Sequence, residues 1–438
     1  MIGAYLGPMF SPRVMPVVAL GCSLVLAAPA VVRAQDPVPR PIDLADALRL
    51  ARQAGPLRQV ADARRQIGLG RVTETNQWAN PSIEWRRENL GSTLLPDIFA
   101  TVYLPIDVSG KRLAQRQAAA AGRDRVAREA EADRRTADLE VARAWMRATV
   151  AQGHAAIIGD QVEALREIAR VDAERLKEGQ VSEAVGLRTS LEADRARVAL
   201  VAARREANEA HAALARLLAL PDGPFPGTAP IATPVLPAAP DSVAARHAAL
   251  AARPELQARE AAVQEAQRRL AVERRAVLGE VQLQGGTKET SGFMTGQVGL
   301  AMPMPLFNRN TGARQRAAGE YHEARLLRDD MRVVVSAAAA SAWANYQQVQ
   351  RAAADAATFD ARGREVARIA RLSYREGHAT LTELLEAERA AADARQAHLR
   401  WAADAWMARL ELERAIGARL DADSPLDLPI YSPQPTGR

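Results

Sequence analysis

The sequence predicts a mainly helical chain with a small β part, built from one unit that occurs twice. Aromatic residues make up only 4% of its 438 residues, whereas charged residues make up 25%. This composition suits long helices that pack on small side chains and argues against an ordinary β sandwich. In addition, two long stretches lack proline, and short segments of alternating polarity precede each of them.

The duplication is visible when the chain is compared with itself at an offset of 198 residues. Proline, tryptophan and glycine landmarks then coincide: Pro56 with Pro254, Pro105 with Pro303, Trp145 with Trp343, and Gly179 with Gly377. We therefore predict a first repeat at 43–220 and a second at 241–420. The proline-rich segment 221–240 is the linker, and 421–438 is a C-terminal tail.

Each repeat is predicted to run helix, strand, strand, very long helix, turn, helix. Asp43 is the expected cap of a first helix that extends to about Trp78. Four segments alternate like strands, at about 82–88, 98–106, 279–285 and 293–303. The rods are expected at about 112–177 and 313–375, each about 100 Å long at ~1.5 Å per residue. Helices of about 35 residues follow the turns at Gly179 and Gly377.

The first 34 residues have the pattern of a secretory signal peptide. Arg13 precedes an apolar stretch that ends in Val32-Arg33-Ala34, a small-residue cleavage pattern. A retained membrane anchor is one alternative, and lipidation at Cys22 is another. Cys22 is the only cysteine, which excludes an internal disulfide framework.

Several function classes do not fit this composition. The net charge of +6 is spread along the chain without a dense basic block, so we expect no nucleic-acid partner. We expect no enzyme activity, because no nucleophile–base arrangement or phosphate loop is present. We also expect no cofactor and no metal site, since the six histidines have no ligand spacing: His154, His211, His247, His322, His378 and His398.

Four strands impose a physical constraint. Strands of 7–10 residues match the length of a tilted membrane-spanning strand, but four cannot close a barrel, and an open edge is not tolerated in lipid. Three chains would pool twelve strands and twelve helical rods. An exported chain of this kind would form a conduit that crosses the periplasm and the outer membrane.

Two segments carry a resemblance to a known family. The doubled unit resembles TolC-type outer-membrane efflux proteins, and the segments 80–91 (NPSIEWRRENLG) and 105–112 (PIDVSGKR) resemble their CzcC-like branch. The resemblance implies a long α-helical barrel plus a 12-stranded β-barrel shared by a homotrimer. It further implies a place in the Gram-negative outer membrane, in contact with its lipid, with a long periplasmic extension. The partners would be a periplasmic adaptor and an inner-membrane resistance-nodulation-division (RND) pump that exports divalent heavy-metal cations.

The same resemblance implies a gate at the periplasmic end. Tyr374 matches the family's tip tyrosine, and Glu383 and Glu386 match its two acidic ring positions. The two glutamates are three residues apart and so lie near one helical face, where threefold symmetry would form carboxylate rings that attract cations. Solvated surface carboxylates are the alternative for this pair.

The polar residues that help to hold the closed end together in some family members, here called the latch, are less well matched in this sequence. Ala379 stands where some members carry an arginine, and Ala184 and Val185 replace a polar pair. The residues expected at the helix-turn tips, where the adaptor would bind, are Lys177, Gly179, Glu183, Arg375 and Gly377.

Three alternatives stay open. A duct of the same fold for drugs or other organic solutes would share every feature above. A periplasmic adaptor would have one helical hairpin flanked by many strands, and a structural coiled-coil protein would have unbroken heptads and no strand pairs.

Overall fold

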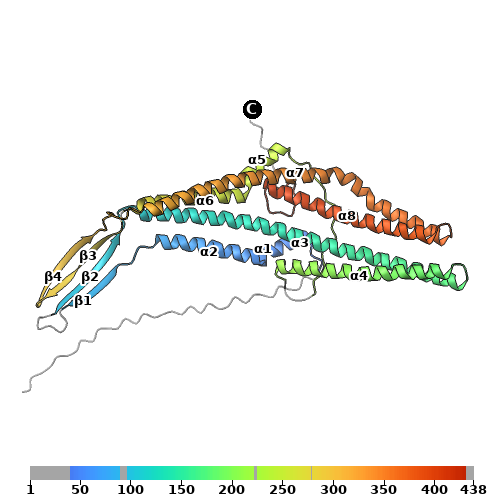
Figure 1. Ribbon diagram of the computed structural model, residues 1–438, viewed down its shortest axis with the longest axis horizontal. Helices are drawn as coiled ribbons and strands as arrows, with labels where there is room; N and C mark the ends of the chain where they lie inside the picture. Colours follow the sequence, from blue (N-terminus) through green and yellow to red (C-terminus); the bar gives the residue numbers. More distant parts are fainter. Residues whose placement is uncertain (1–39, 89–95, 221–223, 278, 431–438) are drawn as a thin grey trace, which may run out of the picture. The chain divides into compact units, whose positions relative to one another are not determined.

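The computed structural model describes residues 40–88, 96–220, 224–277 and 279–430 (Figure 1), all of which belong to one unit, Val38–Arg438. The predicted signal peptide with Cys22, part of the 80–91 motif and the last eight residues lie outside the described residues.

The described elements follow the predicted order in both repeats. The first repeat contains α1 (Leu44–Ala54), α2 (Pro56–Asn76), β1 (Ser82–Glu88), β2 (Asp97–Ile106), α3 (Lys111–Lys177) and α4 (Glu183–Leu218). The second contains α5 (Ser242–Ala252), α6 (Pro254–Arg275), β3 (Val281–Thr290), β4 (Phe293–Ala301), α7 (Thr311–Arg375) and α8 (Leu381–Ile416). The mainly helical class with a small β part is confirmed, and the two rods lie where the proline-free stretches placed them.

Equivalent contacts recur in the two repeats at the same offset. The indole N–H of Trp145 donates to the Ile42 carbonyl at 2.8 Å, and that of Trp343 donates to the Pro240 carbonyl at 2.9 Å. Both members of the second pair lie 198 residues after those of the first. Each repeat thus fastens the chain preceding its first helix to its long helix in the same way.

The single helix predicted from Asp43 to Trp78 is wrong in one respect, because it is two helices. Asp43 does cap α1, accepting the N–H of Asp46 at 2.6 Å. The helix stops at Gly55, and Pro56 begins α2. Proline has no N–H to donate, and its ring clashes with the carbonyl four residues earlier, so a continuous helix is interrupted there.

The four strands form one antiparallel sheet in the order β1-β2-β3-β4. β3 extends to Thr290, beyond the predicted end at 285. Gly286 permits this, since any side chain there would collide with the backbone of Ala100 on β2. Over this glycine, the Gln297 amide donates to the Thr101 hydroxyl at 2.8 Å. Pairing with β2 therefore overrides the low strand preference of the glycines.

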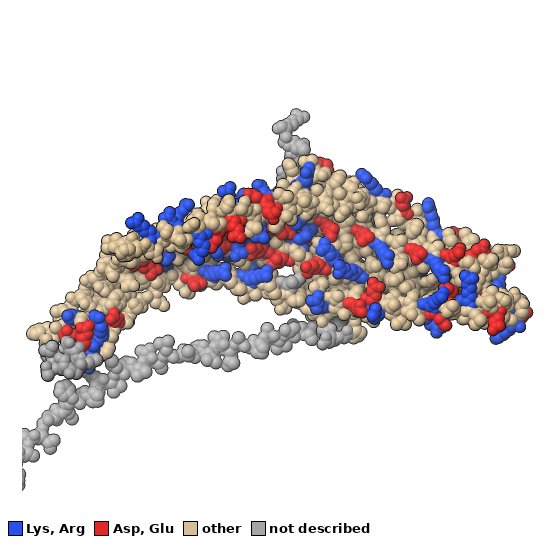
Figure 2. Space-filling view, viewed as in Figure 1, with Lys and Arg blue, Asp and Glu red and all other residues tan. Residues whose placement is uncertain are grey.

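β4 ends at Ala301 rather than at 303. Pro303 follows closely and cannot donate a backbone hydrogen bond, so pairing stops before it. In the view of Figure 2, charged side chains gather over the helices and at the far end of the sheet, whereas the strands between them are mostly uncharged.

The helices form a wall with two free edges. Beside the sheet the packing order is α2, α3, α6, α7, and towards the helix turns it is α4, α3, α8, α7. Together with the sheet order, this places β1, α2 and α4 at one edge and β4 and α7 at the other. Within the described residues, no helix is long and apolar enough to cross a membrane.

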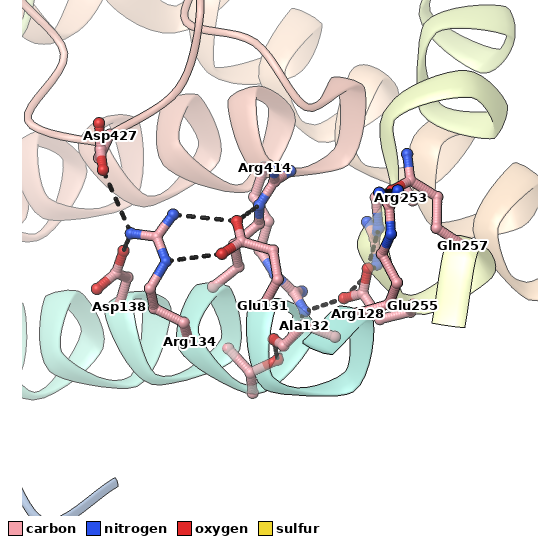
Figure 3. Close-up of polar contacts among 12 residues, drawn as sticks. Arg128, Glu131, Ala132, Arg134, Asp138, Arg253, Glu255, Gln257, Arg414 and Asp427 are labelled. Atoms are coloured by element: carbon pink, nitrogen blue, oxygen red, sulfur yellow. Dashed lines mark hydrogen bonds and ion pairs between the residues drawn. The ribbon is translucent and has the colours of Figure 1, made fainter. Parts of the chain in front are cut away.

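Hydrogen bonds join the two repeats where α3 meets α6 and α8 (Figure 3). One Arg414 nitrogen on α8 donates to the Thr136 hydroxyl on α3 at 3.1 Å, and also to Glu255 on α6, within the second repeat, at 2.7 Å. Farther along α3, Arg128 donates to the Gln257 amide oxygen. The contact surface between the two repeats of one chain is thus polar along this part of α3.

A second polar cluster is fully buried. Arg409 and Glu413 are 1% and 0% exposed, and the guanidinium donates to the Glu413 carboxylate at 3.2 Å and to the Val235 carbonyl at 3.0 Å. Arg409 also pairs with Asp421. The cluster ties the linker, α8 and the segment after α8 together.

Candidate functional site at the helix-turn end

Two turns lie side by side at the end of the wall opposite the sheet (Figure 1). The α3–α4 turn contains Gly179 with a φ of 73°, and the α7–α8 turn contains Gly377 with a φ of 78°. Only glycine adopts this conformation without a steric cost. The spacing of the two glycines in the sequence therefore fixes where both rods reverse.

A buried hydrogen-bonded cluster connects the two hairpins just before these turns. The Tyr374 hydroxyl on α7 donates to Asp172 Oδ1 on α3 at 2.6 Å, and the Thr189 hydroxyl on α4 donates to Asp172 Oδ2 at 2.8 Å. Asp172 and Thr189 are 0% exposed and Tyr374 is 7% exposed. A carboxylate in this position is stable only because both of its oxygens are hydrogen-bonded.

Arg175 adds a second link between the hairpins. Its guanidinium carbon lies 5.5 Å from the centroid of the Tyr374 ring, and one of its nitrogens donates to the Arg375 carbonyl at 2.8 Å. The positive charge on the ring face is a favourable cation–π arrangement.

The protonation state of Tyr374 suits its role as a donor. Burial raises the pKa of the Tyr374 phenol above its ordinary value of 10.0, and its hydrogen bond to the Asp172 carboxylate raises this pKa further. The phenol therefore stays protonated and keeps donating to Asp172 throughout the neutral pH range.

Two ion pairs extend the contact between the hairpins away from the turns. Arg389 on α8 donates to Glu192 on α4 at 2.7 Å, and Arg395 on α8 donates to Asp160 on α3 at 2.8 Å. Burial alone would raise the pKa of Glu192, but hydrogen bonds from Arg389 and Arg195 bring this pKa below its ordinary value.

The residues that replace the family's polar latch are apolar neighbours of this cluster. Val185 and Ala379 pack against the hydrophobic cluster formed by α3, α4, α7 and α8. In this chain the polar link between the hairpins thus runs from Asp172 to Tyr374 and from Arg175 to the Arg375 carbonyl.

The two predicted ring glutamates have different surroundings. Glu383 closes a capping box on α8: it accepts the Thr380 N–H at 2.7 Å and the Thr380 hydroxyl at 2.9 Å. These hydrogen bonds, the backbone one first, hold the pKa of Glu383 below its ordinary value. Glu386 is exposed, and the described residues offer it no ion pair. Glu386 is therefore the less constrained of the two carboxylates.

The predicted tip residues surround a shallow cavity of about 470 Å³ between the two turns. Arg375 and Gly377 line it, whereas Lys177 and Glu183 are exposed beside it. Its other lining residues are Arg175, Gln180, Val181, Val185, Tyr374, Glu376, Ala379, Thr380 and Leu381.

Reasoning from the sequence missed Asp172, Thr189 and Arg175. One signal was available: Val162, Leu165 and Ile168 form an apolar stripe on α3, and Asp172 continues it four residues later. A carboxylate on a buried helix face needs a partner, but the sequence does not reveal that the partner is Tyr374.

No group of three or more His, Cys, Asp or Glu side chains in the described ranges is placed to hold a metal ion. This part of the molecule is a polar connection that holds the two helical hairpins together.

Comparisons with known proteins place the fold. Residues 245–418 match the model of the family described as outer membrane efflux protein. The resemblance to outer-membrane efflux proteins is therefore confirmed for the second repeat, while the match does not test the CzcC-like branch. No curated protein sequence matches the chain.

Solved structures with the same fold include two outer membrane channels and the channel-forming CusC, and the chain covers most of each. The Campylobacter jejuni CmeC outer membrane channel has a TM-score of 0.74 and 16% identity, with 85% of each chain covered. The open state of the Neisseria gonorrhoeae MtrE outer membrane channel has a TM-score of 0.72 and 19% identity, covering 88% of this chain and 90% of that one. CusC has a TM-score of 0.71 and 17% identity, covering 85% and 92%.

Proposed function

Since the second repeat matches the outer membrane efflux protein family and the described chain has the fold of such channels, we propose that this chain is one third of the wall of an exit duct. Three copies would enclose a water-filled path across the outer membrane and much of the periplasm. The duct would perform no chemistry.

The distribution of exposed apolar side chains carries this proposal. The described helices α6 and α8, in the middle of the wall, expose no large apolar side chain, whereas the edge helices expose many. Those on α2 and α4 are Val60, Ile67, Leu69, Leu187, Leu191, Val198 and Val201. Those on α7 are Leu326, Leu327, Val333, Val334, Phe359, Val366, Ile369 and Leu372. Exposed apolar surface of this extent marks an interaction site.

The two edges are different surfaces, so copies join head to tail. Such contacts close into a ring when the rotation per copy is right. The sheet has the same requirement, because β1 pairs only with β2 and β4 only with β3 among the described strands. Joining β4 of one copy to β1 of the next would remove both open edges, as lipid demands, and three copies would supply twelve strands.

The helix-turn end would then lie in the periplasm, far from the sheet. The adaptor would bind there, near Lys177, Gly179, Glu183, Arg375 and Gly377, and connect the duct to an inner-membrane RND pump. Glu386 would narrow the path at this end, with Glu383 beside it, and the buried Tyr374 would hold together the hairpins that form the gate. The source of energy and most selectivity would reside in the pump.

The cargo we propose is divalent heavy-metal cations, on the strength of the segments 80–91 and 105–112. Deletion of the gene should lower tolerance to one or more divalent metals and leave drug tolerance intact. Loss of drug tolerance alone would replace the metal assignment by the organic-solute duct, without changing the proposed architecture.

Assembly gives a direct test of the duct itself. The protein should be recovered from outer membranes as a trimer that heating dissociates, and it should form ion-conducting channels in planar bilayers. Recovery as a soluble monomer would contradict the proposal and favour a periplasmic adaptor or a structural coiled-coil protein.

Replacing the two tip glutamates tests the constriction. We expect Glu386→Ala to lower the preference for cations over anions, because three exposed carboxylates at one level attract cations. Glu383→Ala should have a smaller effect, since that carboxylate is already hydrogen-bonded in the capping box. The measurement is the reversal potential under a salt gradient, and an unchanged value for both variants would exclude them from the narrow part of the path.

A further inference from the structure

The proposed ring contains two kinds of seam, meaning contact surfaces between a first and a second repeat: one lies within each chain and the other between neighbouring copies. The duplication relates the two. Inside each chain, the first repeat meets the second along α3 and α6 beside the sheet, and along α3, α4, α7 and α8 at the helix-turn end. Between copies, the second repeat of one chain would meet the first repeat of the next. A contact inside the chain therefore predicts a contact between copies. Each residue is replaced by its equivalent in the other repeat, which is 198 positions later for a first-repeat residue and 198 positions earlier for a second-repeat residue.

Burial supports this correspondence. Ile168 and Leu385 are buried in the cluster that joins the hairpins, at 9% and 5% exposure. Their counterparts at the free edges are Val366 and Leu187, which are 50% and 64% exposed. At equivalent positions, the free edges of the wall thus carry apolar side chains like those of the buried seam, but there they are exposed.

The two seams differ in chemistry at the position of the buried hydrogen bond near the turns. The buried pair of Asp172 and Tyr374 corresponds to Ala370 and Leu176. Ala370 is partly buried against the same hydrophobic cluster, and Leu176 is 37% exposed. A charged hydrogen bond inside the chain therefore becomes an apolar contact between copies.

The next pair changes in the same way. Glu192 and Arg389 correspond to Ala390 and Leu191, and Leu191 is 50% exposed. The third pair, Asp160 with Arg395, corresponds to Thr358 and Arg197, which do not carry opposite charges. None of these three pairs thus has a charged or hydrogen-bonded carboxylate counterpart in the other seam, whereas the link from Arg175 to the Arg375 carbonyl corresponds to Ser373 and Lys177, which keep a polar contact possible.

We propose that the seam between neighbouring copies at the helix-turn end is apolar, and that it stays closed while the polar seam inside each chain opens. On one copy it consists of Leu176, Leu187 and Leu191, and on the next of Val366, Ala370 and Ala390. This assignment rests on the ring proposed above.

The physical reason is the response of each seam to water. When the hairpins of one chain separate, water replaces the hydrogen bonds of Asp172, Glu192 and their partners, so the net loss is modest. Water offers no such replacement for the apolar contacts between copies, so separating the copies would leave apolar surface exposed at a cost in free energy.

Cross-linking with a short bis-maleimide tests the assignment. The double variant Leu176→Cys/Ala370→Cys should give covalently linked trimers in outer membranes, and Leu191→Cys/Ala390→Cys should do the same. The matched control, Leu176→Cys/Arg368→Cys, moves the second thiol to an exposed position about 200° around α7 and should remain monomeric on a denaturing gel, as should the unsubstituted chain.

The outcomes separate this inference from the proposed function. Heat-sensitive trimers of the unsubstituted chain in outer membranes, but no link through either cysteine pair, would overturn the apolar seam and leave the duct intact. Absence of any trimer would overturn both. In bilayers, linked Leu176→Cys/Ala370→Cys channels should conduct as before linking, and a loss of conductance would show that the copies must separate there for the path to open.

Discussion

Tyr374→Phe is expected to open the helix-turn end. The substitution removes the hydroxyl that donates to Asp172 at 2.6 Å and leaves a fully buried carboxylate with Thr189 as its remaining hydrogen-bond donor. A hydrogen bond to a charged group contributes roughly 1.5–3 kcal/mol. Its loss should shift the closed–open equilibrium of one latch by about tenfold or more, at 1.4 kcal/mol per factor of ten.

Single-channel recording measures this effect as a higher conductance or a larger open fraction. Tyr321→Phe is the matched control, because Tyr321 is a partly exposed tyrosine on the same helix, far from the turn. Asp172→Asn should have a smaller effect, since an amide still accepts from the Tyr374 hydroxyl. Equal conductance of Tyr374→Phe and the unsubstituted channel would show that this pair does not hold the end closed.

The same pair predicts how closure depends on pH. The pKa of Tyr374 is raised in the folded chain, so its contribution to closure is fully present below the unfolded value of about 10. It is lost as the pH rises through the folded value. Tyrosine ionisation should therefore leave the closed state unaffected between about pH 6 and 9, and opening through Tyr374 should require strongly alkaline solution.

Arg409→Met should destabilise the fold more than any surface change. It leaves Glu413, which is 0% exposed, without its cation. Removing one member of a buried ion pair typically costs 3–5 kcal/mol, as the remaining charge is desolvated and unpaired. The urea midpoint of the purified protein should fall accordingly, and Arg409→Met/Glu413→Leu should recover part of the loss.

Arg205 offers a matched control for this prediction. It pairs with Glu209 at the same spacing of four residues on α4, at 3.8 Å, but the two side chains are 79% and 70% exposed. Exposed pairs of this kind contribute about 0–1 kcal/mol, so Arg205→Met should leave the midpoint nearly unchanged. A similar shift for both variants would mean that the buried cluster does not stabilise the chain specially.

The long-range framework follows directly from local signals in the sequence. The rods lie where proline is absent, and they reverse at Gly179 and Gly377, whose positive φ angles few other residues accept. Alternating polarity located all four strands. Their ends were less predictable: β3 continues to Thr290 because its backbone pairs with β2, a neighbour that the local sequence does not encode.

The connection at the helix-turn end was predictable only in part. Tyr374 and Glu383 were identified by resemblance, but Asp172 lies 202 residues from Tyr374 in the chain, and no local pattern pairs them. The sequence left two interpretations of Glu383 open, a carboxylate ring at the gate or a solvated surface carboxylate. The structure shows its carboxylate in the capping box of α8.

The sequence by itself determined the duplicated order of helices and strands, because proline, glycine and periodic polarity act on the backbone within a few residues. Only the tertiary structure decided which side chains meet across the two repeats, and which apolar surfaces stay uncovered at the edges of the wall. Burial and hydrogen bonding between distant residues depend on how the rods pack side by side, and that packing is set by the whole fold.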